Sequence, residues 1–290
     1  MKQADRRWSM PVISDCHVHT SFSADCEAPM EQMVLSAIQR GIQTLCFTEH
    51  YDEDSPFIND PEGERLRFVF DFDVYYEELQ RMREKYKDRI RLLCGAEIGM
   101  HPACRDRILR FADRYHDKFD FLIGSTHAAD GLDPYYPSYF EGRSLEDSYR
   151  AYYRASLLNV RTFDFFDSYA HLDYVLRYAP LNAVPQHPRA YWNTLFEDEI
   201  REILDILIER GQSLELNTQA LFRGFPDANP DRTVLDLYGK EGGTRVTVGS
   251  DAHVPACVGA GFDIARATLL NVGIRCVTVY ERRVPRTYAI

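Results

Sequence analysis

Positive charge is scarce in this chain. Its 290 residues include 34 Lys and Arg against 45 Asp and Glu, so the formal net charge is -11. Binding along a nucleic-acid backbone requires Lys and Arg that neutralise several phosphates. The composition therefore argues against long nucleic acids as partners. It remains compatible with a small anion held by metal ions and one or two arginines.

Long apolar runs and flexible linkers are also missing. No segment reaches the roughly 18 uninterrupted apolar residues of a membrane helix, and no apolar stretch of signal-peptide length follows the charged N-terminus. There is no Pro/Gly/Ser-rich linker, low-complexity tract or fixed-period repeat. We therefore expect no membrane partner and a single domain over residues 1–290, with the motif-bearing barrel at about 11–280.

Paired cysteine motifs are absent as well. The seven cysteines form no Cys-x-x-Cys and their number is odd. Several lie in apolar runs, where a free thiol behaves as a small hydrophobe. Reduced thiols are typical of the cytosol, so we expect a cytoplasmic protein. The sequence leaves the oligomeric state open.

Short strand-like runs alternate with amphipathic helical segments along the chain. The strand-like runs are Pro11–Cys16, Thr44–Thr48, Ile90–Gly95, Phe119–Gly124, Phe163–Ser168, Ser213–Asn217 and Thr244–Gly249. The helical segments are Pro29–Arg40, Val74–Lys87, Pro102–His116, Leu145–Asn159, Thr194–Arg210, Asp231–Lys240 and Asp263–Asn271. This alternation predicts parallel βαβ units, and seven of them favour an α/β barrel over an open sheet.

Polar residues of the metal-binding type follow nearly every predicted strand. They are His17, His19, His50, Glu97, His127, His171, Asp251 and His253, with Asp25 in the loop after the first strand. In an open doubly wound sheet, ligands would gather at one switch point. Only a closed ring of parallel strands brings all of these strand ends together. The sequence therefore predicts a barrel with a metal site at the C-terminal ends of its strands.

Two of the candidate pairs have the spacing of strand residues that share a face. Residues i and i+2 point the same way, so His17 and His19 can face one ion, as can Asp251 and His253. Imidazoles with carboxylates suit zinc, iron or manganese, and so many ligands imply two or three ions. A carboxylate such as Glu97 can bridge two ions, and clustered cations would turn a bridging water into hydroxide at neutral pH. The pattern indicates a hydrolytic site.

The surrounding motifs carry a family resemblance. They are His17-Val18-His19-Thr20, Phe22-Ser23-Ala24-Asp25, Thr48-Glu49-His50, Gly95-Ala96-Glu97, Gly124-Ser125-Thr126-His127, His171-Leu172-Asp173 and Ser250-Asp251-Ala252-His253. Together they resemble the PHP (polymerase and histidinol phosphatase) superfamily, most closely its monofunctional histidinol-phosphatase branch. The match runs from about residue 13 to 280. It implies a distorted, TIM-like (β/α)7 barrel with a trinuclear site.

The resemblance also implies a role for each ligand. Three divalent ions (Zn, Fe or Mn) would be held by His17, His19, Glu97 and Asp251, by Glu97, His127 and His171, and by Asp25, His50 and His253. Asp25 has a second interpretation, as a helix-start carboxylate just before Pro29. Glu97, Asp251 and His253 are the residues expected to carry catalysis.

Substrate contacts are expected from three further residues. In the branch that this chain resembles, an arginine shortly after the strand-five histidine contacts phosphate, and Arg177 holds that place. A planar guanidinium fits phosphate bidentately, although a surface salt bridge is the alternative interpretation. Asn217 and Arg223 lie in another strand-end loop and are second candidates. The chain departs from the branch at Ser168-Tyr169-Ala170, which replaces a Gly-containing run before His171.

The aromatic segment 133–140 follows the His127 motif without helical or strand periodicity. It could form a lid over the mouth of the barrel. Aromatic packing that merely anchors a long loop is the other interpretation, and the sequence does not separate the two.

The resemblance implies a metal-dependent phosphomonoesterase that acts on a small molecule. We expect hydrolysis of L-histidinol phosphate to L-histidinol and phosphate, in histidine biosynthesis, by attack of metal-bound hydroxide on phosphorus. One alternative is a PHP phosphoesterase acting on nucleotides or other small phosphoesters. A non-catalytic PHP domain is less favoured because every ligand position is filled. An amidohydrolase is disfavoured because His127 stands where a carboxylated lysine is expected and Lys118 precedes the strand.

Overall fold

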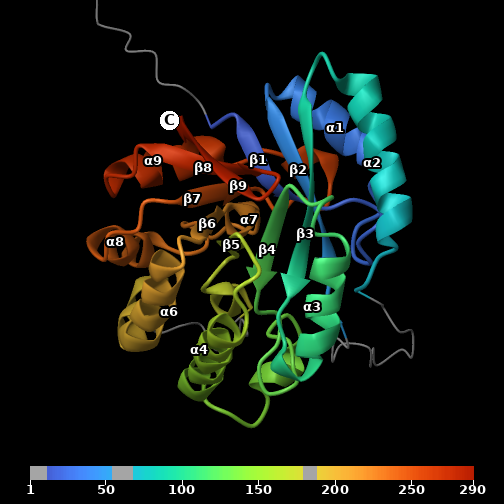
Figure 1. Cartoon of the computed structure of the whole chain (residues 1–290). Helices are drawn as coiled ribbons and strands as arrows, with labels where there is room; N and C mark the ends of the chain where they lie inside the picture. The colour runs from blue at the N-terminus through green and yellow to red at the C-terminus, as the bar shows by residue number, and fades with distance from the viewer. Residues whose placement is uncertain (1–11, 54–67, 179–187) are drawn as a thin grey trace, which may run out of the picture.

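Seven parallel strands form the centre of the molecule (Figure 1). The computed structural model describes residues 12–53, 68–178 and 188–290, so Pro11 of the predicted first strand lies outside the described residues. The strands are hydrogen-bonded in chain order, each parallel to the next. They are β1 (Ser14–Val18), β2 (Thr44–Tyr51), β3 (Arg91–Gly99), β4 (Phe121–Ser125), β5 (Ser168–Tyr169), β6 (Ser213–Asn217) and β7 (Val246–Gly249).

The ring closes between its first strand and the segment after its last. Val18 forms a parallel bridge with Ala252, and the Asp251 amide donates to the His17 carbonyl oxygen at 2.7 Å. Gly249 allows this approach, because a Cβ atom there would lie 2.3 Å from the Cβ atom of His17. The predicted (β/α)7 barrel is confirmed, and its distortion lies at this seam, where a loop takes the place of strand pairing.

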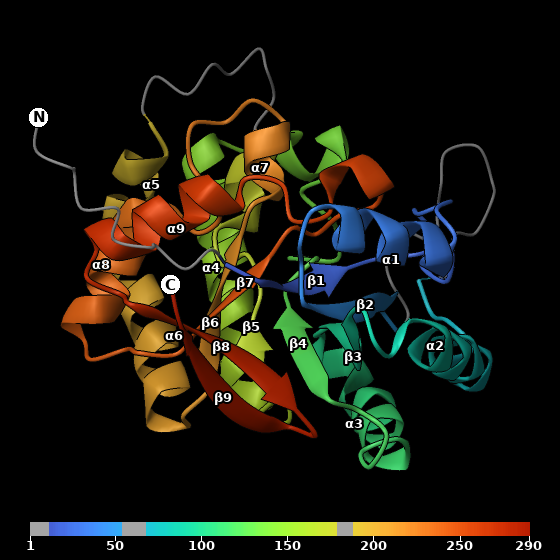
Figure 2. The ribbon, with the colours of Figure 1, turned by 90° about the horizontal axis from the view of Figure 1, so that it is seen from above.

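Helices surround the strands on the outside of the ring (Figures 1 and 2). They are α1 (Met30–Gln39), α2 (Phe72–Tyr86), α3 (Arg105–Arg114), α4 (Leu145–Thr162), α5 (Arg189–Leu195), α6 (Glu197–Glu209), α7 (Gln219–Phe222), α8 (Arg232–Lys240) and α9 (Phe262–Asn271). Apolar residues at helical spacing face the sheet, as in α6, which buries Ile200, Ile203, Leu204 and Leu207. None of these helices is both long and apolar enough to span a bilayer.

The fifth strand is shorter and later than the sequence predicts. The apolar run Phe163–Ser168 reads as a strand, yet α4 extends to Thr162 and the strand begins only at Ser168. Phe163 and Phe166 are buried in the main hydrophobic core. Asp167 reaches β4 with its side chain, since its Oδ2 accepts the Leu122 amide at 2.8 Å. The apolar residues of this run therefore serve packing between helix and sheet.

The chain ends in an antiparallel hairpin that the sequence does not announce, formed by β8 (Cys276–Glu281) and β9 (Val284–Ala289). It packs against the barrel at the amino-terminal ends of the strands (Figure 2), where the Tyr280 ring stacks on Phe121 with centroids 5.4 Å apart. Arg282 and Arg283 form the turn with φ of 50° and 64°. Such turns usually contain Asn-Gly or Asp-Gly, so the usual hairpin signal is missing.

Gly249→Ala should destabilise the barrel at its seam. The new methyl group would overlap His17 and approach Glu215 Oε1 at 2.7 Å, and overpacking of this kind costs about 1–3 kcal/mol. Urea denaturation measures the loss. Gly239→Ala in α8 is the matched control, because its Cβ atom would meet its nearest neighbour at 3.8 Å. Equal stability of the two variants would contradict the role given to Gly249.

Candidate metal centre

The candidate ligands lie at the mouth of the barrel, further along the same strands than an apolar cluster that forms its floor. Cys46 and Leu93 belong to an apolar cluster that also contains Tyr280 of the terminal hairpin. His50 and Glu97 lie four residues further along the same two strands, about 13 Å nearer the carboxyl ends. An even spacing keeps them on the same face, so both point into the mouth.

A register shift in β1 places His17 in the mouth as well. Asp15 pairs with Leu45 but Val18 pairs with Phe47, so β1 contains one extra residue between these pairs. Such a bulge turns neighbouring residues toward the same side. Cys16 accordingly joins the apolar floor, while the next residue, His17, reaches the candidate ligands.

Glu97 is the hub of the site. Its Oε2 atom lies 3.2 Å from His17 Nε2 and 3.0 Å from His50 Nδ1. Its Oε1 atom lies 3.1 Å from His127 Nε2 and 2.9 Å from His171 Nε2. Burial would raise the pKa of this carboxyl, but the imidazoles of His17, His127 and His50 outweigh burial and hold the pKa well below its usual range. Glu97 is therefore ionised, and its two oxygens face different pairs of imidazoles.

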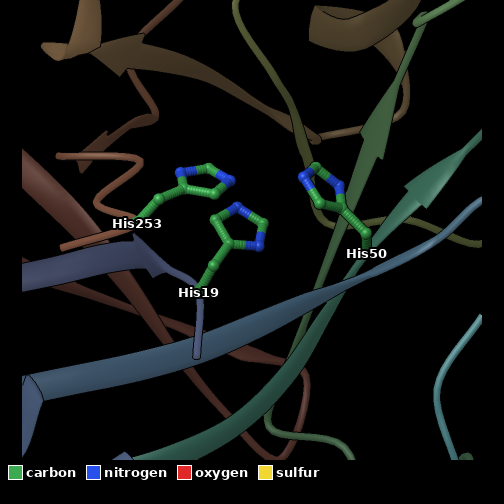
Figure 3. Close-up of side chains that lie close together, drawn as sticks. All are labelled: His19, His50 and His253. Atoms are coloured by element: carbon green, nitrogen blue, oxygen red, sulfur yellow. The ribbon is translucent and has the colours of Figure 1, made fainter. Parts of the chain in front are cut away.

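A second group of ligands lies on the β1, β2 and β7 side of the mouth. The imidazoles of His19, His50 and His253 turn toward one another (Figure 3), with the His19 ring 4.2 Å from His50 and 4.3 Å from His253 between centroids. Asp25 Oδ2 lies 3.1 Å from His253 Nε2 and 3.5 Å from His50 Nε2. Asp251 Oδ1 lies 3.4 Å from His19 Nε2. Asp25 thus faces the ligands as well as preceding α1.

Two carboxylates behind the ligands were not singled out from the sequence. His17 Nδ1 donates to Glu215 Oε1 at 2.6 Å, and His127 Nδ1 donates to Asp52 Oδ1 at 2.8 Å. Carboxylates in this position fix the tautomer and orientation of metal-binding imidazoles. Glu215 could have been found by strand parity, as an inward residue of β6, and Asp52 as the residue two after His50. Asp52 fits because a Cβ atom at Gly99 would lie only 1.6 Å from Asp52 Oδ1.

A serine holds His19 in the same way. Ser23 Oγ donates to Glu49 Oε2 at 2.6 Å and accepts the His50 amide at 3.1 Å. Its hydroxyl hydrogen is therefore committed, and His19 Nδ1, 3.1 Å away, must be the donor to Ser23 Oγ. This network leaves His19 Nε2 unprotonated, and burial together with His50 lowers the pKa of His19 to about 3.

The arrangement fits cations. Neutral His17 and His19 both present lone pairs on Nε2, and these two atoms are 3.0 Å apart. Without an ion, only a proton on His17 relieves this contact; although burial lowers its pKa, Glu215 and Glu97 raise that pKa well above the usual range. Within the described ranges His50 Nδ1, Glu97 Oε2 and His253 Nε2 are buried, and their close contacts do not have the geometry of hydrogen bonds. Divalent ions would remove the cost of leaving these atoms unpaired.

Three overlapping sets of donors have ligand atoms within 4.8 Å of one another: His19, His50 and His253; His17, His19 and Glu97; and His50, Glu97 and His127. Glu97 joins two of these sets, and His19 and His50 are each shared as well. The candidate ligands therefore form one continuous cluster of donor atoms rather than separate groups.

Arg177 lies in the wall of the site and is buried. Its Nη1 is 3.3 Å from Asp251 Oδ2, while Nη2 donates to Asn217 Oδ1 at 2.8 Å and Nε donates to Asn229 Oδ1 at 2.6 Å. This environment is not that of a surface salt bridge. Asn217 is fully buried behind Arg177 and donates to Asp251 Oδ2 at 3.1 Å, so its side chain orients these two residues. Arg223 lies at the exposed rim.

A cavity of about 440 Å³ connects these groups. It is lined by candidate ligands, by Arg177 and Arg223, and by aromatic side chains, namely Phe68, Tyr135, Tyr136, Tyr174, Tyr178 and Phe222. The aromatic segment after His127 divides its residues between two roles. Tyr135 and Tyr136 line the cavity, whereas Tyr139 is buried and donates to the Ser148 carbonyl oxygen at 2.6 Å.

A closed β/α barrel with buried imidazoles and carboxylates at its mouth defines a class, the barrel hydrolases that depend on divalent metals. The chain belongs to the PHP domain family, whose model matches residues 15–219. The resemblance to its histidinol-phosphatase branch is also confirmed, by the relatives that follow.

The histidinol-phosphatase of Lactococcus lactis subsp. lactis (strain IL1403) is 32% identical over 83% of this chain and 84% of that protein. A probable histidinol-phosphatase of Clostridium acetobutylicum is 29% identical over 94% and 98%. Among solved structures, a histidinol phosphate phosphatase from Lactococcus lactis, complexed with Zn, L-histidinol and phosphate, superposes with a TM-score of 0.84. That structure is 27% identical and covers 95% of this chain and 99% of its own.

Glu215→Gln should weaken metal binding while the barrel remains folded. The amide keeps an oxygen for the His17 Nδ1–H donor but loses the negative charge, and changes behind metal ligands cost about 10- to 100-fold in affinity. Elemental analysis after dialysis against graded chelator measures this loss. Glu84→Gln is the control, because the Glu84 side chain is 77% exposed. Unchanged metal retention would show that Glu215 does not support a ligand.

Metal removal should lower thermal stability. Without cations, the donors around Glu97 remain buried and crowded, whereas ions that bind only the folded chain stabilise it by about 2.7 kcal/mol at a free concentration of 100 Kd. We expect a chelator to lower Tm, and Zn²⁺ or Mn²⁺ added in excess to restore it. Chelator already saturated with metal is the control. A Tm that chelation leaves unchanged would refute metal occupancy of this site.

Proposed function

We propose that this chain is a metal-dependent phosphatase that hydrolyses L-histidinol phosphate to L-histidinol and phosphate, the reaction expected of histidine biosynthesis. The strongest support is the position of buried Arg177 on the same cavity as the candidate ligands, in a chain that aligns over 95% of its length with a phosphatase complexed with Zn, L-histidinol and phosphate. A cavity of about 440 Å³ also suits a small phosphoester rather than a polymer.

Three divalent ions are proposed, of zinc, iron or manganese. Their ligands would be His17, His19, Glu97 and Asp251; Glu97, His127 and His171; and Asp25, His50 and His253. Bound there, such ions supply Lewis-acid stabilisation of phosphate oxygens and a water that ionises near neutral pH. The seven cysteines are all free, which agrees with the expected cytoplasmic location.

The protein's own contribution to phosphate binding would centre on Arg177. Its guanidinium pairs with Asp251 and is fixed by the side-chain oxygens of Asn217, Asn229 and Gln219. A buried Arg held this way is already oriented for a phosphate dianion, so little side-chain entropy is lost on binding. Arg223 at the rim would add a second, more exposed positive charge.

Asp251 and Glu97 would act as permanently ionised carboxylates. Burial alone would raise the pKa of Asp251, but the charges of His17, His253 and Arg177 hold that pKa well below its usual range. The Oδ2 atom accepts from Arg177 and Asn217, while Oδ1 faces His19. Asp251 would therefore align the phosphate-binding arginine with the ligand cluster, and His253 would complete the cluster beside it.

The substrate assignment is tested by phosphate release from a panel. Metal-replete protein should prefer L-histidinol phosphate over AMP, a dinucleotide and phosphotyrosine. Arg177→Lys should lower kcat/KM by about 100-fold with unchanged metal content, because a lysine cannot reproduce a planar guanidinium that Asn217, Asn229 and Gln219 hold in place. Preference for another phosphoester would move the chain to a different PHP activity, and silence across the panel would favour a non-catalytic domain. An active Arg177→Lys variant would remove the role given to this arginine.

A further inference from the structure

The cavity contains a carboxylate that the metal centre does not use. Asp133 lines the cavity and is 8% exposed. Its Oδ1 atom accepts the Tyr135 amide at 2.7 Å and the Tyr174 hydroxyl at 3.2 Å. Its Oδ2 atom accepts no hydrogen bond from the residues that the structure describes. Burial raises the pKa of Asp133 to about 7, and the Tyr135 amide and the charge of His127 oppose this only in part.

No Lys, Arg or His side chain in the described ranges forms an ion pair with Asp133. A buried carboxylate without a cation is costly, and structures retain one mainly where a partner is supplied. Because Asp133 borders the cavity, a bound molecule can supply that partner. The positively charged groups of the cavity, Arg177 and Arg223, instead contact Tyr174 and Tyr178, with guanidinium carbons 5.5 and 5.1 Å from the two ring centroids.

Tyr174 links Asp133 to the metal centre. Its ring centroid lies 5.0 Å from His171 and 5.6 Å from His127, and its hydroxyl reaches Asp133. Asp133 is thus about one phenol ring away from these ligands. A substrate whose phosphate lies at the metals and Arg177 would bring the first atoms of its alcohol part alongside Asp133.

The tyrosines continue outward as an aromatic wall. The Tyr178 ring lies 4.8 Å from Tyr174 and 5.4 Å from Tyr135, and all three rings line the cavity. Aromatic walls of this kind favour flat rings by stacking and favour cations by their negative faces. The cavity therefore combines candidate metal ligands and Arg177 with a carboxylate and aromatic side chains.

We propose that Asp133 is a specificity-determining residue that binds an ammonium group in the alcohol part of the substrate. An aromatic ring of the same alcohol would lie against Tyr174, Tyr178 and Tyr135. The substrate class is then a phosphomonoester of a small amino alcohol that carries an aromatic ring. This inference rests on the proposed phosphatase function and deepens it. Removal of the Asp133 charge should therefore reduce the preference of the enzyme for substrates that have the amine over substrates that lack it.

The test compares L-histidinol phosphate with imidazolylpropyl phosphate, which lacks the amine. In Asp133→Asn, kcat/KM for L-histidinol phosphate should fall about 10- to 100-fold, mainly through KM, while the amine-free ester changes by less than about threefold. Asparagine keeps an oxygen for the Tyr135 and Tyr174 donors, so Tm and metal content should match wild type. Asp130→Asn is the matched control on the same loop, because Asp130 pairs with Arg143 at 3.1 Å outside this cavity.

The outcomes separate the two proposals. If wild type hydrolyses L-histidinol phosphate and Asp133→Asn loses both esters equally, or loses neither, the role of Asp133 is overturned and the phosphatase function stands. If wild type hydrolyses the amine-free ester and not L-histidinol phosphate, the proposed substrate and the ammonium contact both fail.

Discussion

The constraint on which the rest of the structure depends is the repulsion among buried nitrogen and oxygen atoms whose lone pairs face one another. At the mouth of the barrel, imidazole nitrogens and carboxylate oxygens face one another around Glu97, and two imidazole nitrogens lie 3.0 Å apart. In water such groups would move apart or take up protons. Here they are buried on stiff strands, so the fold forces them together and cations are needed to balance them. Folding of the barrel and binding of cations are therefore coupled.

The seam shows how closely the two are joined. Gly249 on β7 leaves room for the His17 side chain, and His17 Nδ1 donates to Glu215 on β6, the strand paired with β7. The same backbone that closes the ring therefore sets the tautomer of a ligand. Asp15 on β1 is a second link across the seam. Its buried carboxylate accepts the Ser250 amide at 2.9 Å and the Gly259 amide at 2.8 Å, and these bonds fix the loop that carries Asp251.

Sequence patterns predicted that the candidate ligands lie together because all of them except Asp25 come at the end of an apolar run, and parallel strands end at one face. They missed Glu215 and Asp52 because a supporting carboxylate looks like any inward or loop acid until its imidazole partner is in view. The fifth strand was misplaced because buried aromatic residues have the same composition in a strand and in a helix–sheet connection. The terminal hairpin was missed because its Arg-Arg turn is stabilised by tertiary contacts, such as the Arg282 amide on Asp120 at 3.0 Å.

The net charge of the chain and the charges in the cavity affect binding at different distances. A net charge of -11 disfavours polyanions at long range, yet screening limits that effect to about 8 Å in physiological salt. Inside the cavity, the metals, Arg177 and Arg223 would dominate for a phosphate group, and Asp133 would face a positive group of the same molecule. A molecule that is negative at one end and positive nearby satisfies both parts. Inorganic phosphate would satisfy only the phosphate-binding groups, whereas the product alcohol would keep its contact with Asp133. Substrate specificity would then depend on residues other than those that hold the metals.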